Sequence, residues 1–498
     1  MNVNPITRLD YPDLDVIRVE DTYYMVSTTM HFMPGCEILQ SFDLVHWEHA
    51  TYVYETLDHT DAQQLKSGQN IYGQGMWAAS LRYHEGRFYI CFVANDTRKT
   101  YLYTSEKIDG PWKKQLIEGF YHDGSLLFDE DGRNYIVYGN DEIWITELNE
   151  DLTAPKKDGL HRLLVSDHKN PKLGYEGSHI QKINGYYYIF LVHSLRDRWM
   201  RTEACFYSDS LEGEFTGGDV LCDDRGYCGQ GVAQGGIVDT PDGKWYAMLF
   251  QDSGAVGRLP ILLPVTWKDH FPVFGQNGHV PEEIEVHSTR PGYIYQPLVG
   301  SDDFCNGLLP RWQFNHDPDP RYYHLDALQG TFTITTREVC TELTQAVNTL
   351  TQRMSYPSCA AEVTVDASAL KEGDVAGLCA FQGCYAAVGI TKHHGKYEVL
   401  MLDKKEDGIL DMTEGTVVES HQMDFRLEAD FCNMKDEARC YYRVNNGDWL
   451  PIGTVHKLYF KLDHFTGCRF GLFCYAAEET GGSACFRDFK YYDVDEIS

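Results

Sequence analysis

The sequence predicts an all-β protein in which a five-bladed β-propeller is followed by an antiparallel β-sandwich. One pattern occurs five times in the first 270 residues: apolar residues alternate around a tight polar turn, which is the strongest short-range signal for a β-hairpin. The copies recur at intervals of roughly 40–65 residues, as expected for a repeat architecture. From about Asp302 the repeat ends, and short segments of alternating apolar and polar residues indicate a sandwich.

Each of the five units reads as an apolar strand, a polar turn and an aromatic pair that enters a second strand. The first strand of every propeller blade lines the central channel, so equivalent positions in the units are expected to converge on one axis. The units are Val16–Val26, Ser80–Cys91, Ser125–Val137, Ser178–Phe190 and Gly236–Leu249.

The repeat also selects candidate site residues. Counting back 12 residues from the second aromatic of each pair, or 11 in the first unit, whose turn is shorter, gives one position per unit. These positions hold Asp13, Trp77, Asp123, Glu176 and Gln234. Acidic residues often occupy turns before strands, but three of five in register, with a tryptophan in a fourth, favour a site at one end of the channel.

Length and charge limit the domain number and the partners. At 498 residues the chain exceeds the size of a single hydrophobic core, so we expect a propeller domain over 1–298 and a sandwich domain over 299–498. The net charge of −31 argues against nucleic acid and against an anionic membrane surface, because both need a basic face. No apolar stretch approaches the roughly 18 residues of a membrane-spanning helix.

The cysteines indicate the compartment. All 15 are scattered through strand-like segments without a CxxC pair, which predicts buried free thiols rather than a zinc site or a disulfide framework. The first residues lack the basic and apolar regions of a signal peptide. We therefore expect a cytoplasmic protein.

The acids at the axis carry the candidate chemistry. Two carboxylic groups that flank a glycosidic bond are the minimum set for glycoside hydrolysis: one donates a proton to the leaving oxygen, and the other activates water or attacks carbon. A third carboxylate nearby can tune and orient the acid. Trp77 offers a flat face for a sugar ring, and a buried Arg258 would need a carboxylate or a sugar hydroxyl as its partner.

The chain resembles glycoside hydrolase family 43 over nearly its whole length. The resemblance rests on the motifs DYPDLDVIRV, GMWAASLRYHEGRFY, HDGSLLFDEDGRNY, EGSHIQKINGYYY, GGIVDTPDGKWYAM and VTWKDHFPVFG. It implies a five-bladed propeller with the carboxy-terminal, concanavalin-like jelly-roll sandwich of the xylosidase/arabinofuranosidase branch. It also implies hydrolysis with inversion, which releases xylose or L-arabinofuranose.

The same resemblance implies roles for single residues. Asp13 in YPD matches the general base, Asp123 in HDGS the pKa-tuning and orienting acid, and Glu176 in YEGSH the general acid. Arg258 matches a substrate-binding arginine near the base. The chain departs from the family where many members carry a histidine and this one carries Gln234, which argues against a calcium ion in the channel. Water and backbone carbonyls could still coordinate a structural calcium ion, so that alternative stays open, and no cofactor is required.

Further substrate-binding residues are predicted around the mouth of the channel. Phe32, in the HFMPG loop, is assigned to a subsite, whereas His31 fits a substrate ligand and a core residue equally well. The Phe381–Tyr385 loop of the sandwich is expected to wall part of the pocket, with Phe381 as a contact, and to leave space for one or two sugar units. The alternative is that Phe381 belongs to the core of the sandwich.

These expectations combine into an inverting exo-acting hydrolase of small oligosaccharides derived from hemicellulose. Within that class, α-L-arabinofuranosidase is favoured over β-D-xylosidase. The alternative is a sugar-binding propeller without catalysis, although such a protein would not need all three acids. A homo-oligomer remains compatible with the sequence.

Overall fold

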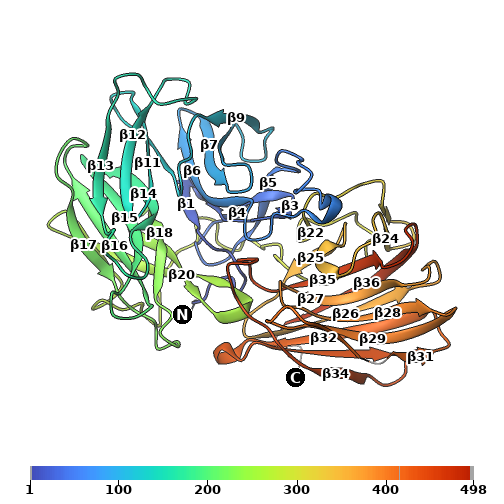
Figure 1. Cartoon of the computed structure of the whole chain (residues 1–498). Helices are drawn as coiled ribbons and strands as arrows, with labels where there is room; N and C mark the ends of the chain where they lie inside the picture. The colour runs from blue at the N-terminus through green and yellow to red at the C-terminus, as the bar shows by residue number, and fades with distance from the viewer. Residues whose placement is uncertain (1–2, 414, 494–498) are drawn as a thin grey trace.

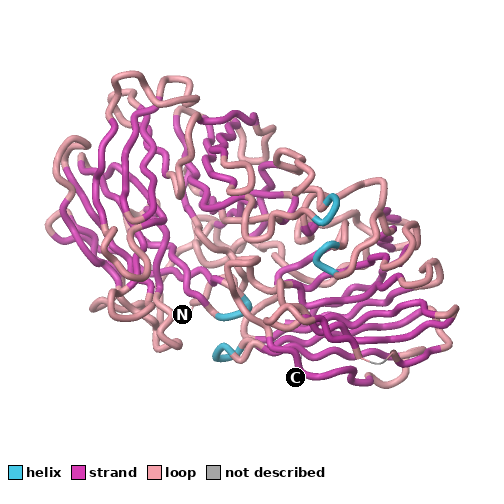
Figure 2. Tube along the Cα trace, viewed as in Figure 1, coloured by secondary structure: helices cyan, strands magenta, loops and turns pink. Residues whose placement is uncertain are grey.

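The protein is built almost entirely from strands. The computed structural model describes residues 3–413 and 415–493. Within these ranges the helical segments are short 3₁₀ turns, drawn in cyan in Figure 2. They are η1 (Lys66–Gly68), η2 (Gly254–Val256), η3 (Leu343–Gln345) and η4 (Cys432–Met434).

Five four-stranded antiparallel sheets form the blades of the predicted propeller (Figure 1). Blade 1 contains β1 (Asp15–Val19), β2 (Thr22–Val26), β4 (Gly35–Ser41) and β5 (Glu48–Tyr54). Blade 2 contains β6 (Met76–His84), β7 (Arg87–Ala94), β8 (Lys99–Ser105) and β9 (Lys113–Ile117). Blade 3 contains β10 (Ser125–Phe128), β11 (Asn134–Asn140), β12 (Glu142–Leu148) and β13 (His161–Ser166). Blade 4 contains β14 (Glu176–Ile183), β15 (Tyr186–Ser194), β16 (Arg201–Ser208) and β17 (Thr216–Leu221). Blade 5 contains β18 (Val232–Asp239), β19 (Trp245–Asp252), β20 (Arg258–Lys268) and β21 (Phe271–Phe274).

The first strand of each blade contacts the first strands of both neighbours, so β1, β6, β10, β14 and β18 form a closed ring around the axis. Hydrogen bonds from one blade to the next fix the height of these strands along the axis. In each bond a side chain of one innermost strand accepts the backbone N–H of the following blade. The bonds run from Leu81 N–H to Asp15 Oδ2 (2.8 Å), from Leu126 N–H to Ser80 Oγ (3.1 Å) and from Ile180 N–H to Ser125 Oγ (3.0 Å).

Asp15 is the charged centre of this ring. Its Oδ2 also accepts a hydrogen bond from Arg82 Nη1 at 2.7 Å, and its Oδ1 lies 3.2 Å from His179 Nδ1. Burial on its own would raise the pKa of Asp15, but the Arg82 guanidinium and His179 reverse that effect and lower the pKa to about 2. Asp15 is therefore a structural anion.

The carboxy-terminal half forms a sandwich of two antiparallel sheets, coloured orange to red in Figure 1. The first sheet contains, in order, β3 (Phe32–Met33), β22 (Gln313–Asn315), β25 (Leu350–Arg353), β35 (Arg469–Ala476), β27 (Asp374–Phe381), β28 (Ala386–His393), β29 (Lys396–Lys404) and β30 (Leu410–Met412), and β31 (Thr416–Val418) also pairs with β29. The second contains β23 (Tyr323–Asp326), β24 (Thr331–Thr335), β36 (Ser483–Asp493), β26 (Ser358–Asp366), β32 (Gln422–Asp430), β33 (Glu437–Arg443) and β34 (Leu450–Lys457). Apolar side chains of both sheets fill one core between them.

One strand of the first sandwich sheet comes from the propeller half of the sequence. β3 lies between two strands of blade 1, yet it pairs with β22 through Met33 opposite Phe314 and Phe32 opposite Asn315. A buried ion pair at the same junction joins Arg353 of β25 to Glu37 of β4, with 2.8 Å between Nη1 and Oε2. The two sheet systems therefore share backbone hydrogen bonds as well as packed side chains.

All 15 cysteines are free, as the sequence predicts, and 9 of them are buried. Among the described residues, no helix has the length and apolar character needed to cross a bilayer.

We expect Asp15→Asn to lower the free energy of unfolding by roughly 3 kcal/mol, because the variant leaves the buried Arg82 guanidinium without its anion. The contribution of Asp15 should be complete above its unfolded pKa of 3.8 and should disappear as pH falls through about 2. Urea unfolding monitored by fluorescence measures this loss. The matched control is Asp21→Asn, whose partner Arg290 is about as exposed as Asp21 itself and whose loss should cost less than about 1 kcal/mol. Equal losses in the two variants would contradict the role assigned to Asp15.

Candidate active site

The structure gives the positions that are equivalent in the five blades, and they differ from the predicted set at two places. The anchor tyrosine pairs with the residue seven positions before it in blades 1, 2 and 4, but eight before it in blades 3 and 5. The equivalent positions, four residues before those partners, are Asp13, Ala78, Asp123, Gly177 and Gln234. Trp77 and Glu176 each lie one residue earlier. The count from the sequence was wrong in blades 2 and 4 because their hairpins turn through two residues, as in blade 1.

These equivalent positions share a left-handed backbone. Their φ values are 51° at Asp13, 32° at Ala78, 48° at Asp123, 65° at Gly177 and 67° at Gln234. Non-glycine residues rarely adopt this conformation, and it is common at functional sites. At Gly177 a side chain is also excluded by space, because a Cβ there would lie 2.8 Å from Gln234 Cγ.

β-Bulges bring the two offset residues to the same end of the channel. The register shifts between Trp77 and Ser80 in β6 and between Glu176 and His179 in β14. A bulge inserts one residue into a strand and redirects the neighbouring side chains. The indole of Trp77 and the carboxylate of Glu176 consequently both lie near His122: the ring centroids of Trp77 and His122 are 6.2 Å apart, and Glu176 Oε2 is 3.7 Å from His122 Nε2.

Asp13 is held by three donors from different parts of the propeller. Thr28 Oγ1 donates to Oδ2 at 2.8 Å, and Gln234 Nε2 and Arg258 Nη1 donate to Oδ1 at 3.0 and 3.1 Å. Only 11% of the Asp13 side chain is exposed. The carboxylate is therefore fixed in direction while part of it stays accessible from the channel mouth, as an acceptor of a water proton requires.

The carboxylates of Asp123 and Glu176 both lie near Nε2 of His122. Asp123 Oδ2 is 3.5 Å from His122 Nε2 and accepts the backbone N–H of Gly177 at 3.0 Å, so it holds the backbone next to Glu176. Asn140 Nδ2 donates to Glu176 Oε2 at 2.8 Å. Burial raises the pKa of Asp123 to about 6, with His122 acting against this rise and Glu176 and Asp13 adding to it. The Asp123 carboxylate in turn raises the pKa of His122 to about 9, so this imidazole is a cation at neutral pH.

Arg258 connects Asp13 to the sandwich. Its side chain is buried, and besides the bond to Asp13 it donates from Nη2 to the carbonyl oxygen of Phe465 at 3.3 Å. The guanidinium lies 4.3 Å from the centroid of the Phe465 ring, and that ring lies 5.6 Å from Trp77. A sandwich loop therefore forms one wall of the site.

The loop predicted to form this wall lies deeper in the structure. Phe381 and Tyr385 are buried, 1% and 0% exposed, in a core cluster that also contains Phe32. Instead, Gln382 between them accepts a hydrogen bond from the Tyr459 backbone, so the predicted loop supports the segment that carries Phe465. The assignment of Phe381 to substrate contact was wrong because Phe381 ends β27 and points into the core.

Phe32 and His31 are core residues as well. Phe32 belongs to β3, is completely buried, and lies under the Arg469 guanidinium at 3.6 Å. His31 is completely buried, and its ring packs against Tyr72 and His316 at 4.8 and 5.0 Å. The subsite assigned to Phe32 was wrong because its strand belongs to the sandwich sheet. His31 lies in the core, but neither of its ring nitrogens has a hydrogen-bond partner among the described residues.

Four further residues of the site were not selected from the sequence. His122 directly precedes Asp123 in the HDGS motif, and this adjacency is the sequence signal for its place in the site. Arg201 is buried beside Asp252, with 2.9 Å between Nε and Oδ2. Its guanidinium also interacts electrostatically with Glu176 and Asp13. The fully buried Glu203 accepts the Gln234 N–H at 2.7 Å, and burial raises its pKa well above the usual range. The positions of Arg201, Glu203 and Phe465 in the site depend on contacts with distant segments, which leave no signal in the local sequence.

A propeller with three carboxylates and an arginine at one end of its channel is the architecture of a glycoside hydrolase. The model of glycosyl hydrolases family 43 matches residues 3–272, and that of the β-xylosidase C-terminal concanavalin A-like domain matches residues 301–492. The chain belongs to glycosyl hydrolase family 43.

Known proteins similar to this chain include one named as a β-xylosidase and one named as an α-L-arabinofuranosidase. A β-xylosidase of Formosa agariphila is 26% identical over 99% of this chain and 89% of its own length. A non-reducing end α-L-arabinofuranosidase of Bacteroides ovatus is 24% identical over 82% of this chain and 79% of its own. A solved bifunctional GH43-CE protein of Bacteroides eggerthii is 42% identical with a TM-score of 0.93; the match covers 100% of this chain and 64% of that longer protein.

We expect Phe465→Ala and Phe381→Ala to show which of the two sandwich loops forms a wall of the site. Phe465→Ala removes the ring next to Trp77 and Arg258, so kcat/KM should fall about tenfold, or roughly 1.4 kcal/mol of transition-state stabilisation, with little change in stability. Phe381→Ala leaves a cavity in the core and should cost about 3–5 kcal/mol of unfolding free energy. Steady-state kinetics and thermal unfolding of both variants provide the measurement. A large kinetic loss in a stable Phe381→Ala variant would restore the loop of residues 381–385 as the wall.

Proposed function

We propose that the protein is an inverting, exo-acting hydrolase that releases L-arabinofuranose, D-xylose or both from small hemicellulose-derived oligosaccharides. The observation that carries the proposal is the convergence of Asp13, Asp123 and Glu176 from three blades, each with its own set of hydrogen-bond donors. The names of the Formosa and Bacteroides ovatus relatives support the two sugars. A non-catalytic sugar-binding propeller would not need these three acids together.

Each acid has a separate task in the proposed reaction. Asp13, oriented by Thr28, Gln234 and Arg258, takes a proton from the water that attacks the anomeric carbon. Glu176 gives its proton to the glycosidic oxygen, so the bond to the leaving sugar breaks as the bond to water forms. Asp123 accepts the Gly177 N–H and so orients the backbone next to Glu176.

The wall formed by Phe465 supports the exo mode of action. It lies against Trp77 and Arg258 on the side of the sandwich and limits how far a chain extends from the acids. Burial of the charged groups behind this wall also strengthens their electrostatic effect on the reacting bond.

The 15 free cysteines support a cytoplasmic location for this activity, where reducing conditions preserve thiols. We propose small oligosaccharides, rather than nucleic acid or membrane, as the partners. A homo-oligomer is kept in this proposal as the alternative to a monomer.

The reaction is proposed to need no metal. Ligand atoms of His122, Asp123 and Glu176 lie within 4.8 Å of one another, which is close enough to hold an ion. The pKa of about 9 at His122 means that a proton already occupies this imidazole at neutral pH and opposes a cation. On the axis, the carboxylate oxygens of Asp15 already interact with Arg82 and His179, so they are not free to coordinate calcium.

Glu176→Ala should lose much more activity on substrates with poor leaving groups than on nitrophenyl glycosides, since a good leaving group needs little protonation. Asp13→Ala is the matched control and should lose activity on both, because it removes activation of water. Proton NMR during hydrolysis should show the inverted anomer first. A retained anomer would reject inversion, and equal losses in Glu176→Ala across leaving groups would reject the acid role. A panel of nitrophenyl arabinofuranosides and xylosides then identifies the preferred sugar.

Dialysis against EDTA should leave kcat and KM unchanged within about twofold, because the proposed steps use side chains and water alone. Readdition of Ca²⁺ or Zn²⁺ to the dialysed enzyme provides the comparison. A loss on dialysis that one of these ions restores would show that the cluster around His122 works as a metal site.

A further inference from the structure

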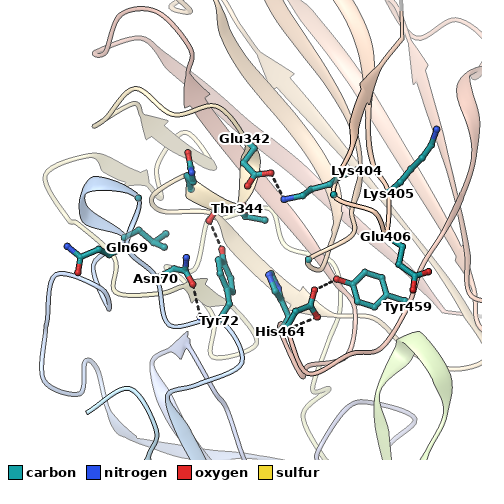
Figure 3. Close-up of a pocket in the computed structure, with 16 residues that line it drawn as sticks. Gln69, Asn70, Tyr72, Glu342, Thr344, Lys404, Lys405, Glu406, Tyr459 and His464 are labelled. Carbon is teal, nitrogen blue, oxygen red and sulfur yellow. Dashed lines mark hydrogen bonds and ion pairs between the residues drawn. The ribbon is translucent and has the colours of Figure 1, made fainter. Parts of the chain in front are cut away.

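A cavity of about 300 Å³ lies between the propeller and the sandwich, outside the glycosidase site. Its walls are a propeller segment containing Gln69 and Tyr72, the region of η3, the turn that follows β29, and the loop between β34 and β35 with Tyr459 and His464 (Figure 3). The catalytic acids do not line this cavity. Its volume is at the lower end of the range for small-molecule sites.

The charged groups of the cavity wall are paired. Lys404 pairs with Glu342, Lys405 with Asp411, Glu406 with Lys461, and the Tyr459 hydroxyl donates to Asp463. A charged ligand would have to break one of these pairs, whereas a neutral ligand would leave them intact. The remaining polar groups include the side-chain amides of Gln69, Asn70 and Gln345, which donate and accept in the way that sugar hydroxyls require.

His464 adds an unsatisfied buried group to this wall. Only 6% of the residue is exposed, and among the described residues its Nδ1 has no hydrogen-bond partner. Its ring stacks on Tyr72, with centroids 3.9 Å apart and 7° between the planes. Burial lowers the pKa of His464 to about 4, so the imidazole is neutral and offers one donor and one acceptor. Buried polar groups without a partner are uncommon and require an explanation.

We propose that this cavity is a second sugar site, which takes a neutral pentose or a short pentose oligosaccharide as an effector. The choice of pentose rests on the proposed function, because a hydrolase of such oligosaccharides meets both its substrate and its product. The partly exposed ring of Tyr459 provides a flat apolar face, the amides provide the polar contacts, and the His464 ring lines the cavity beside them.

The chain connects this site directly to the catalytic one. His464 lines the cavity, and the next residue, Phe465, contacts Arg258 and Trp77. Phe465 has a left-handed backbone with φ of 56°, and its N–H donates to the Lys461 carbonyl at 2.8 Å. A ligand that orders His464 therefore also biases the position of Phe465, so occupation of the cavity should change hydrolysis without touching the acids.

Binding to the Glu176→Ala variant of the whole chain, which should not hydrolyse xylobiose because that substrate has a poor leaving group, tests the site. Titration with D-xylose, L-arabinose and xylobiose by calorimetry and ligand-observed NMR should reveal two classes of site, the second with an affinity on the order of millimolar. The double variant Glu176→Ala, Gln69→Trp carries a bulky ring at the exposed rim of the cavity. Its affinity for the sugars should fall at least tenfold at one class of site and stay unchanged at the other. Gln345→Ala serves as a second variant if the first is unstable.

The matched control is Leu462→Trp. Leu462 is 72% exposed on the same loop but does not line the cavity, so this variant should retain both classes. A single class in the Glu176→Ala parent, or two unchanged classes in a folded Gln69→Trp variant, would overturn the proposal. So would loss of the second class in Leu462→Trp alone.

Kinetics of the active enzyme provides the second measurement. Added D-xylose should change the apparent kcat on a nitrophenyl glycoside in the parent enzyme and in Leu462→Trp, but act as a simple competitor in Gln69→Trp. Purely competitive inhibition in all three would reject the effector role. Failure to hydrolyse any glycoside would instead reject the proposed function, while the binding titration would still decide whether the cavity takes a sugar.

Discussion

The site depends on the height at which the innermost strands are held along the propeller axis. Asp15, Ser80 and Ser125 each accept a backbone N–H from the following blade, and Arg82 ties Asp15 to the next blades. Two residues before this level lie the left-handed positions that include Asp13 and Asp123. A slip of one strand by a single residue would turn its side chains to the opposite face. The ring therefore decides whether three carboxylates from separate blades can meet at all.

Asp13 illustrates how many parts of the chain meet at one carboxylate. Asp13 is held by Thr28 from blade 1, by Gln234 from blade 5 and by Arg258, which itself rests on the sandwich residue Phe465. Behind Gln234 stands the buried Glu203 of blade 4, whose carboxyl group fixes the Gln234 backbone. The direction of the Asp13 carboxylate is thus set by groups far apart in sequence, which is how preorganised sites keep their geometry without reorganising during reaction.

The local patterns predicted the fold well, but they predicted contacts between distant segments poorly. Alternation and turns located all five blades, and the motifs identified Asp13, Asp123 and Glu176. The register count nevertheless placed Glu176 at a position that Gly177 occupies, because a one-residue difference in hairpin pairing is not visible in turn composition alone. Glu176 still lies at the site because the β-bulge in β14 redirects its side chain. Phe32 and Phe381 were misassigned because an aromatic residue near a loop has the same sequence appearance whether it faces a pocket or a core.

The strand formed by Phe32 and Met33 has a consequence for how this protein could have been assembled or could be recombined. It leaves blade 1, pairs with Phe314 and Asn315, and so makes the edge of the sandwich sheet out of propeller sequence. Cutting the chain between residues 274 and 313 would leave one fragment with a protruding apolar strand and the other with an open sheet edge, the kind of surface that promotes aggregation. The two halves are therefore not interchangeable modules. A graft from a relative would have to carry the HFMPG segment together with the sandwich it completes.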